Sequence, residues 1–390
     1  MAVAGGIYLW RSFRSHSGRC RRQWRQSFSK LMRRFRRAGP LCFLAILLLS
    51  LIGGLLYGST NIDTAAYRVP RVLHWLGQGQ WHWIYTYDPR QNSTACDFEW
   101  LAAPLIEFTG TDRFLFLINW VSYLMLPGLV FSVFRRFGVR PRVAWWWMWF
   151  LAAGWCYALQ AGSTGNDCFA AVYALAAMDL ALRARETASC GELFLSVLAI
   201  SLACGTKQNN LPLLLPWSVA AIGSIKLVRM RPAIGVLVAV VALLVSPVPI
   251  SIANWVHTGN WMGYPRHTSG LENPLWISAR ANGSPFWTAA ANVVLIAIQN
   301  LTPPYFPLAE RVNGMMDRFL QTPFGMSQFA APANCAKLSR FADELSAGIG
   351  PCVCLLILFA VFGALKLRTT PAVGQISGRD RLLGWLRVSP

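Results

Sequence analysis

The chain has few acidic residues and few charged residues of any kind. Its 390 residues include 16 Asp and Glu against 36 Lys and Arg, and only 13% are charged. Soluble domains carry about a quarter charged residues, so this composition argues against an ordinary soluble protein. Apolar residues make up 55% of the chain, and apolar runs near the ~20 residues that cross a bilayer recur. The composition therefore predicts an all-α, polytopic membrane protein.

Motifs for several common chemistries are also missing. The ten cysteines show no C-x-x-C spacing and the five histidines form no HExxH sequence, so no metal site is predicted, although a divalent cation stays open. Walker A and GxGxxG sequences are absent too, and we see no serine triad. We therefore expect no cofactor, and no transport driven by nucleotide hydrolysis within this chain.

The basic residues lie in short clusters between the apolar runs. Residues 1–39 hold eleven Lys and Arg and no acidic residue, and the formal net charge of the chain is +20. Cytoplasmic loops of membrane proteins are rich in Lys and Arg, and anionic headgroups attract such segments. This arrangement predicts a cytoplasmic tail over 1–39 followed by a signal anchor, and it argues against nucleic acid as a partner.

Eight apolar runs are predicted to cross the membrane, with Lys or Arg at the cytoplasmic turns. They are Leu41–Gly58, Phe114–Phe134, Trp145–Gln160, Cys168–Leu182, Leu193–Cys204, Leu211–Ile225, Ala233–Ile252 and residues 348–365. The run Phe286–Leu301 is interrupted, so we expect an interfacial or re-entrant helix there; nine spans are the alternative. The membrane domain is predicted over 40–368 and a second basic cytoplasmic tail over 369–390.

Polar residues collect on the face opposite the N-terminal tail. Residues 59–112 are too long for a turn and should contain short helices, one of them over 64–76. Residues 160–167 (QAGSTGND) and 205–210 (GTKQNN) form two further turns on this face. A transporter or lipid-carrier flippase would place polar residues at mid-span depth and repeat its architecture. Because the spans are nearly free of charge, the pattern favours an enzyme acting at the outer surface.

Lys207 is the strongest candidate for a binding residue. Basic residues are normally placed on the cytoplasmic side, and a charge at membrane depth is costly and usually paired. An ammonium group binds phosphate as a point charge, and helix N-termini add to the favourable field. The position predicts that Lys207 binds a lipid phosphate or pyrophosphate. The alternative is that its side chain snorkels to the lipid headgroups.

Three acidic residues allow two readings each. Asp63 follows the first apolar helix, near Arg68 and Arg71, and is either a general base or the N-cap of the helix over 64–76. Asp167 stands in a helix-start sequence and has the same ambiguity. Glu99 is either a second carboxylate of the site or an interfacial salt bridge.

The order of these segments resembles a known family. After the first span the chain reads NIDTAAYRVPRVLHW, YDPRQN, FEW and GTDRF, and later QAGSTGND and CGTKQNN. Over about residues 40–256 this order is similar to that of bacterial membrane glycosyltransferases of the GT-C fold, in the group of protein mannosyltransferases and aminoarabinose transferases. The resemblance implies a GT-C-like bundle in the bacterial inner membrane. It also implies a polyprenyl-phosphate-linked sugar as donor and a glycan, lipid or protein as acceptor.

The resemblance implies roles for individual residues as well. Asp63 matches an aspartate that acts as, or positions, the base that activates the acceptor hydroxyl, and Glu99 corresponds to a later acidic residue of that loop. The donor pocket is implied to be lined by Asn166, Asp167, Lys207 and Gln208. From the outer loop we further expect substrate contacts by Tyr67, Arg68, Arg71 and Arg90. The chain departs from many relatives at Arg68, where they carry histidine; a non-catalytic GT-C-like protein is a further alternative.

Overall fold

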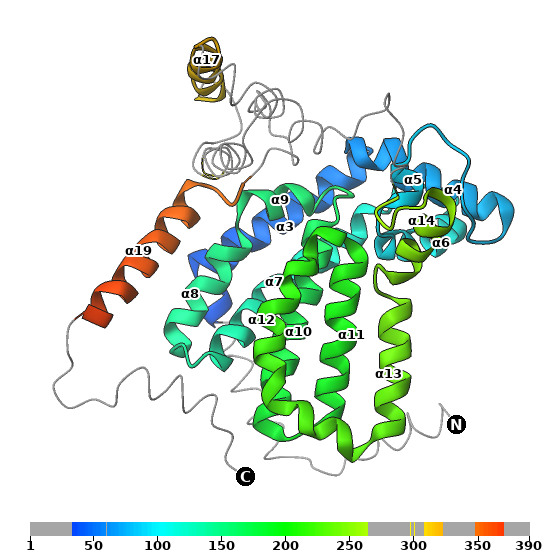
Figure 1. The fold of residues 1–390 in the computed structure, drawn as a ribbon. Coiled ribbons are helices and arrows are strands. Elements are labelled where there is room, and N and C mark those ends of the chain that lie inside the picture. Colours follow the sequence, from blue (N-terminus) through cyan, green and yellow to red (C-terminus); the bar gives the residue numbers. More distant parts are fainter. Residues whose placement is uncertain are drawn as a thin grey trace, which may run out of the picture.

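The computed structural model describes residues 33–59, 61–263, 297, 300, 308–322 and 348–369. Every regular element in these ranges is a helix (Figure 1), which confirms the all-α prediction for the described part of the chain. The expected interfacial helix Phe286–Leu301 and most of both predicted basic tails lie outside the described residues.

Long helices form a bundle that makes up most of the described chain (Figure 1). Its members are α3 (Ala38–Leu56), α7 (Phe116–Arg136), α8 (Pro141–Ala152), α10 (Asp167–Thr187), α11 (Cys190–Thr206), the continuous helix Gln208–Met230 that includes α12 (Leu214–Ala221), and α13 (Pro232–Leu244). The central helix is α10, which packs on α7, α11 and α12. Its Ala177, Ala181 and Ala184 are fully buried, and such small side chains let neighbouring helices approach closely.

Three of these helices are long and apolar enough to cross a membrane, namely α3, α7 and Gln208–Met230. A fourth candidate is α13 together with α14 (Val248–Thr258), which are bent by 50° relative to one another. The described residues thus contain three or four candidate spans, where the sequence predicted eight. The predicted third span breaks into α8 and α9 (Trp155–Gln160), α10 is rich in charge, and α11 has only 17 residues.

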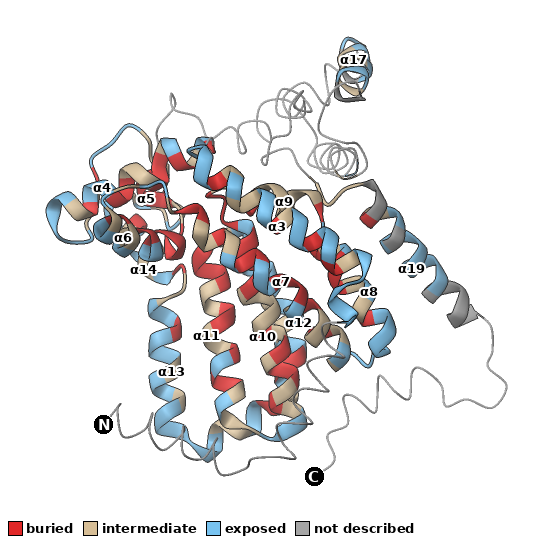
Figure 2. Cartoon of the chain, turned by 180° about the vertical axis from the view of Figure 1, so that it is seen from behind, coloured by how far each residue is buried: buried red, intermediate tan, exposed pale blue. Residues whose placement is uncertain are grey.

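The outer faces of the candidate spans are apolar. Leu49 of α3, Leu215 of α12 and Leu244 of α13 are each more than 60% exposed, and Figure 2 shows exposed residues along the outer sides of α3 and α13. Soluble monomers rarely expose apolar surfaces of this extent. Together with the candidate spans, these faces indicate that the protein associates with a membrane.

One end of the bundle carries a group of short helices (Figure 1). They are the π-helical turn η1 (Thr64–Arg68), α4 (Val69–Gln78), α5 (Arg90–Ser93), α6 (Asp97–Thr109) and α14. We call residues 61–112 together with α14 the polar cap. The expected short helices in the stretch 59–112 are therefore confirmed, and the helix expected over 64–76 corresponds to η1 and α4.

The predicted span Ala233–Ile252 is bent in the structure, and its last part belongs to the polar cap. The sequence predicted a single crossing over Ala233–Ile252, but α13 ends at Leu244 and the chain bends before α14 begins. The Asn254 side chain is fully buried and donates to the Ser93 carbonyl at 3.3 Å, which holds α14 against α5.

Candidate functional site

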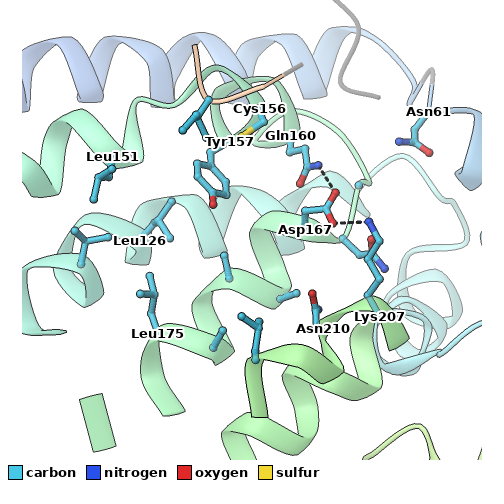
Figure 3. Close-up of a pocket in the computed structure, with 18 of the residues that line it drawn as sticks. Asn61, Leu126, Leu151, Cys156, Tyr157, Gln160, Asp167, Leu175, Lys207 and Asn210 are labelled. Atoms are coloured by element: carbon cyan, nitrogen blue, oxygen red, sulfur yellow. Dashed lines mark hydrogen bonds and ion pairs between the residues drawn. The ribbon is translucent and has the colours of Figure 1, made fainter. Parts of the chain in front are cut away.

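A cavity of about 720 Å³ lies where the polar cap meets the bundle. Its polar lining residues are Asn61, Asp63, Arg68, Gln160, Asn166, Asp167, Lys207 and Asn210. Its apolar lining residues include Leu126, Val130, Leu151, Ala170, Ala171, Ala174, Leu175 and Leu213. Figure 3 shows Leu126, Leu151 and Leu175 on one side of the cavity and Asp167 with Lys207 on the other. The cavity is therefore charged at one end and apolar along α7, α8 and α10.

Lys207 and Asp167 form an ion pair inside this cavity (Figure 3). Lys207 Nζ lies 2.6 Å from Asp167 Oδ1, and the side chains are 38% and 50% exposed. Burial raises the pKa of Asp167, but the Lys207 ammonium, the Gln160 hydrogen bond and the Arg68 charge together lower it by more, so the pKa lies below its ordinary value. The Lys207 ammonium thus contacts a carboxylate in the cavity. The snorkelling alternative would have placed it among the lipid headgroups.

Gln160 frees Asp167 from capping its helix. The Gln160 side-chain oxygen accepts from the Cys168 backbone N–H at 2.8 Å, while its amide nitrogen donates to Asp167 Oδ2 at 2.9 Å. Asn166 occupies the N-cap position of α10, where no side-chain capping bond forms. The capping alternative for Asp167 is therefore wrong, because Gln160 accepts from the Cys168 N–H while the Asp167 carboxylate faces Lys207.

The turns that carry Asp167 and Lys207 are held together by buried amides. Asn166 donates to the Thr206 carbonyl at 2.9 Å, which fixes the start of α10 beside the end of α11. Asn119 of α7 is fully buried and donates to the carbonyls of Ser163, at 3.0 Å, and Gly165. These bonds explain why two short turns, 40 residues apart, present their charged residues to one cavity.

Asp63 also lines the cavity and does not cap its helix. Asn61 Oδ1 accepts from the Thr64 backbone N–H at 3.1 Å, whereas the Asp63 side chain makes no capping bond. The capping alternative for Asp63 is therefore wrong as well. Its carboxylate is 29% exposed and lies 3.6 Å from Arg90 Nη1, so it is accessible from the cavity.

The π-helical turn η1 places the partners of Asp63. Arg68 Nη2 lies 3.8 Å from Asp63 Oδ2, and the Tyr67 hydroxyl donates to the same oxygen at 3.3 Å. Arg68 is 5% exposed and donates to the Thr164 carbonyl, which ties η1 to the turn before α10. Its buried Nε has no partner among the described residues. Single π-helical turns are frequent at functional sites.

Glu99 and Arg71 lie elsewhere, inside the polar cap. Arg71 Nη2 donates to Glu99 Oε1 at 2.9 Å, and the two side chains are 0% and 2% exposed. Arg71 also donates to Thr94 O at 2.9 Å. Neither residue lines the cavity. This placement disagrees with the expected second catalytic carboxylate at Glu99 and with substrate binding by Arg71, because α6 packs on α4 with both charges turned inward.

Three other expected substrate-binding residues do not line the cavity. Tyr67 and Arg90 contact Asp63 instead, and Arg90 Nη2 lies 2.8 Å from Asp88 Oδ2. Gln208 donates to the Ser93 carbonyl at 3.2 Å and so joins the end of α11 to the polar cap.

Three amides that line the cavity were not predicted from the sequence. Asn61, Gln160 and Asn210 stand in the same motifs as Asp63, Asp167 and Lys207. Polar residues crowded into such short turns were the available signal. This crowding does not predict which amides line the cavity. Only the packed structure shows whether an amide faces the cavity or stabilises a turn.

The charged end of the cavity has the groups to bind an anion, and its other end has the walls to bind an apolar chain. Among the described residues, no group of three His, Cys, Asp or Glu side chains is placed to hold a metal ion. No family model, curated protein or solved structure matches the chain. The resemblance to GT-C glycosyltransferases stays a prediction from the sequence motifs.

Proposed function

We propose that this protein is a membrane glycosyltransferase that moves a sugar from a polyprenyl-phosphate donor to an extracytoplasmic acceptor. The amphipathic cavity is the observation that carries the proposal. A polyprenyl-phosphate sugar has the same division into a long apolar chain, an anionic phosphate and a polar sugar. The volume of about 720 Å³ lies in the range of cavities that enclose small ligands.

Lys207 and Arg68 are the proposed phosphate-binding residues. Both line the charged end of the cavity, and their cationic groups come from different elements, the end of α11 and η1. A donor phosphate would replace Asp167 as the partner of Lys207. Such an exchange is inexpensive, since half-exposed ion pairs contribute about 0–1 kcal/mol.

Asp63 is the proposed base. In a direct displacement the acceptor oxygen bonds to the anomeric carbon while the phosphate oxygen departs with its electron pair, and Asp63 takes the acceptor proton. The positive groups near it stabilise the negative charge on the departing phosphate. Its exposure of 29% and its place on the cavity lining support this role.

The proposal places the polar cap on the extracytoplasmic face of a bacterial inner membrane, with the N-terminus in the cytoplasm and eight crossings. Its support is the distribution of charge. Clustered arginines lie at the ends of α3, α7 and α10 that are remote from the polar cap, and such clusters are typical of the cytoplasmic side. The helices α8, α10, α11 and α19 (Pro351–Thr369) would add to the candidate spans.

A flippase for a lipid carrier and a non-catalytic GT-C-like protein are the competing functions. Both could bind a polyprenyl phosphate in the same cavity, but neither consumes it. A flippase would be expected to carry its polar groups toward mid-membrane depth, whereas here they lie at the end of the cavity next to the polar cap.

The decisive experiment follows the donor lipid. Purified protein in nanodiscs is incubated with defined polyprenyl-phosphate sugars and candidate acceptors, and loss of the donor is measured. Wild-type protein should consume a donor, and Asp63→Asn should lower the rate by about 10²–10⁴-fold while donor binding and expression stay normal. Asp112→Asn, an exposed carboxylate of the same cap, is the matched control. Binding without consumption in wild type, or full activity of Asp63→Asn, would overturn the proposal.

A further inference from the structure

A second cavity, of about 370 Å³, lies at the end of the bundle remote from the polar cap. Its lining residues come from the start of α8, from the segment that precedes α3 and from the second half of α7. Three arginines and three aromatic residues line it: Arg34, Arg37, Arg142, Phe131, Trp145 and Trp146.

Positive charge gathers around this cavity. Among the described residues, no carboxylate lines it, and none of its three arginines forms an ion pair. Acidic side chains at this end of the bundle form ion pairs with another arginine, since Arg136 pairs with Asp179 and Glu186. Three guanidinium groups around one cavity repel each other, and an anion between them would remove that repulsion. The N-terminal end of the α8 dipole adds to the positive potential.

The surface beside the cavity is apolar. Val143, Trp146 and Phe150 lie on one exposed face of α8 and are each more than 40% exposed. The rings of Trp146 and Phe150 are stacked with centroids 6.3 Å apart, so the apolar surface continues along α8 away from the arginines. Tryptophan and arginine together are typical of the region where lipid headgroups meet acyl chains. A free phosphate ion would use the arginines and leave this face uncovered.

We infer that this second cavity binds the phosphate of an anionic phospholipid, with the acyl chains along the exposed face of α8. The arginines bind the phosphate through charge-assisted hydrogen bonds. Trp145 and Trp146 contact the glycerol region. The inference does not depend on the proposed transferase, because this cavity shares no lining residue with the one at the polar cap.

The test compares two triple variants that remove equal charge. Arg34→Gln/Arg37→Gln/Arg142→Gln empties the cavity of cations, whereas Arg33→Gln/Arg36→Gln/Arg140→Gln removes three exposed arginines outside its lining. The purified full chain is titrated in detergent with phosphatidylglycerol, phosphatidylcholine and inorganic phosphate, and bound lipid is counted by native mass spectrometry.

Wild type and the control variant should bind phosphatidylglycerol about tenfold or more tightly than phosphatidylcholine, and the cavity variant should lose this preference. The single variant Arg142→Gln should lose part of the preference for phosphatidylglycerol. It allows the same comparison if the triple variant folds poorly. Equal losses in both triple variants, or no loss in either, would overturn the inference. Displacement of the lipid by millimolar inorganic phosphate would also overturn it, because the site would then be one for a free anion.

Discussion

Two ion pairs near the polar cap have similar lengths and opposite surroundings. Arg71 and Glu99 are 2.9 Å apart and 0% and 2% exposed, while Lys207 and Asp167 are 2.6 Å apart and 38% and 50% exposed. Separating a buried pair leaves charges without solvent, so such a pair is fixed. A half-exposed pair exchanges partners at little cost because water compensates for the lost contact.

This difference separates a residue that maintains the fold from one that can bind a ligand. Both pairs consist of one acid and one base joined across distant segments of the chain, so residue type alone does not distinguish them. Location does, since Lys207 and Asp167 line the large cavity whereas Arg71 and Glu99 lie within the polar cap. Substitutions in the buried pair should therefore affect mainly stability, and substitutions in the half-exposed pair should affect mainly ligand binding.

The largest effect is expected in the buried pair. Glu99→Gln keeps the shape of the side chain but leaves the Arg71 guanidinium uncompensated, which should cost about 3–5 kcal/mol of folding free energy. Thermal unfolding of the purified protein in detergent measures this loss. Lys207→Gln in the same assay should change stability by less than about 1 kcal/mol. Equal stability losses in the two variants would break the comparison.

The next effect concerns binding by the exposed pair. Lys207→Gln should weaken binding of a polyprenyl phosphate by about tenfold to a hundredfold, because a charge-assisted hydrogen bond contributes about 1.5–3 kcal/mol. Fluorescence or scintillation proximity binding with a defined lipid measures the affinity. Lys207→Arg keeps the charge and should retain most of the binding. If Lys207→Gln binds the lipid as wild type does, the ammonium is not the phosphate ligand.

Asp97 extends the comparison to a buried carboxyl that has no cation. It is 7% exposed, and burial, with a smaller contribution from Glu99, raises its pKa to about 8. The pKa in the unfolded chain is about 3.9, so the folded protein holds the proton more tightly. The stability contributed by this proton is fully present below about pH 4, falls as the pH rises, and is lost above about pH 8.

Asp97→Asn should remove this pH dependence, because the amide stays neutral. Near pH 4 the two proteins should unfold at similar temperatures, and near pH 8.5 the variant should be more stable than wild type, by about 2–4 °C for each 1 kcal/mol. Asp112→Asn provides the exposed control. A constant difference between Asp97→Asn and wild type across this pH range would show that Asp97 stays ionised in the fold.

The sequence predicted helices best where apolar length decides the outcome. The expected span Phe114–Phe134 corresponds to α7, Phe116–Arg136, because a continuous apolar run ends at a pair of arginines. The expected span Ala233–Ile252 is instead divided into α13 and α14, which are bent by 50° relative to one another near Pro247 and Pro249. The length of an apolar run does not predict whether its helix is straight, so the bend was not predicted from the run.

The candidate site was predictable to a similar degree. The crowding of polar residues into turns on one face suggested that Asp63 and Lys207 share a cavity, and both line it. The partner of Glu99 could not be predicted in the same way. Its pairing with Arg71 depends on how α6 packs against α4, and that packing joins residues 28 positions apart through burial and not through any local pattern.

The smallest effect is expected when the acid of the exposed pair is removed. Asp167→Asn leaves Lys207 without its competing carboxylate, so the affinity for a polyprenyl phosphate without sugar should rise by up to about fivefold, the equivalent of about 1 kcal/mol. The sugar-bearing donor distinguishes a second role. If Asp167 binds a sugar hydroxyl, the same variant should bind the complete donor more weakly while it binds the bare lipid phosphate more tightly. Equal affinity of the variant and wild type for both lipids would mean that phosphate and Asp167 do not compete for Lys207, and the exposed pair would then be as fixed as the buried one.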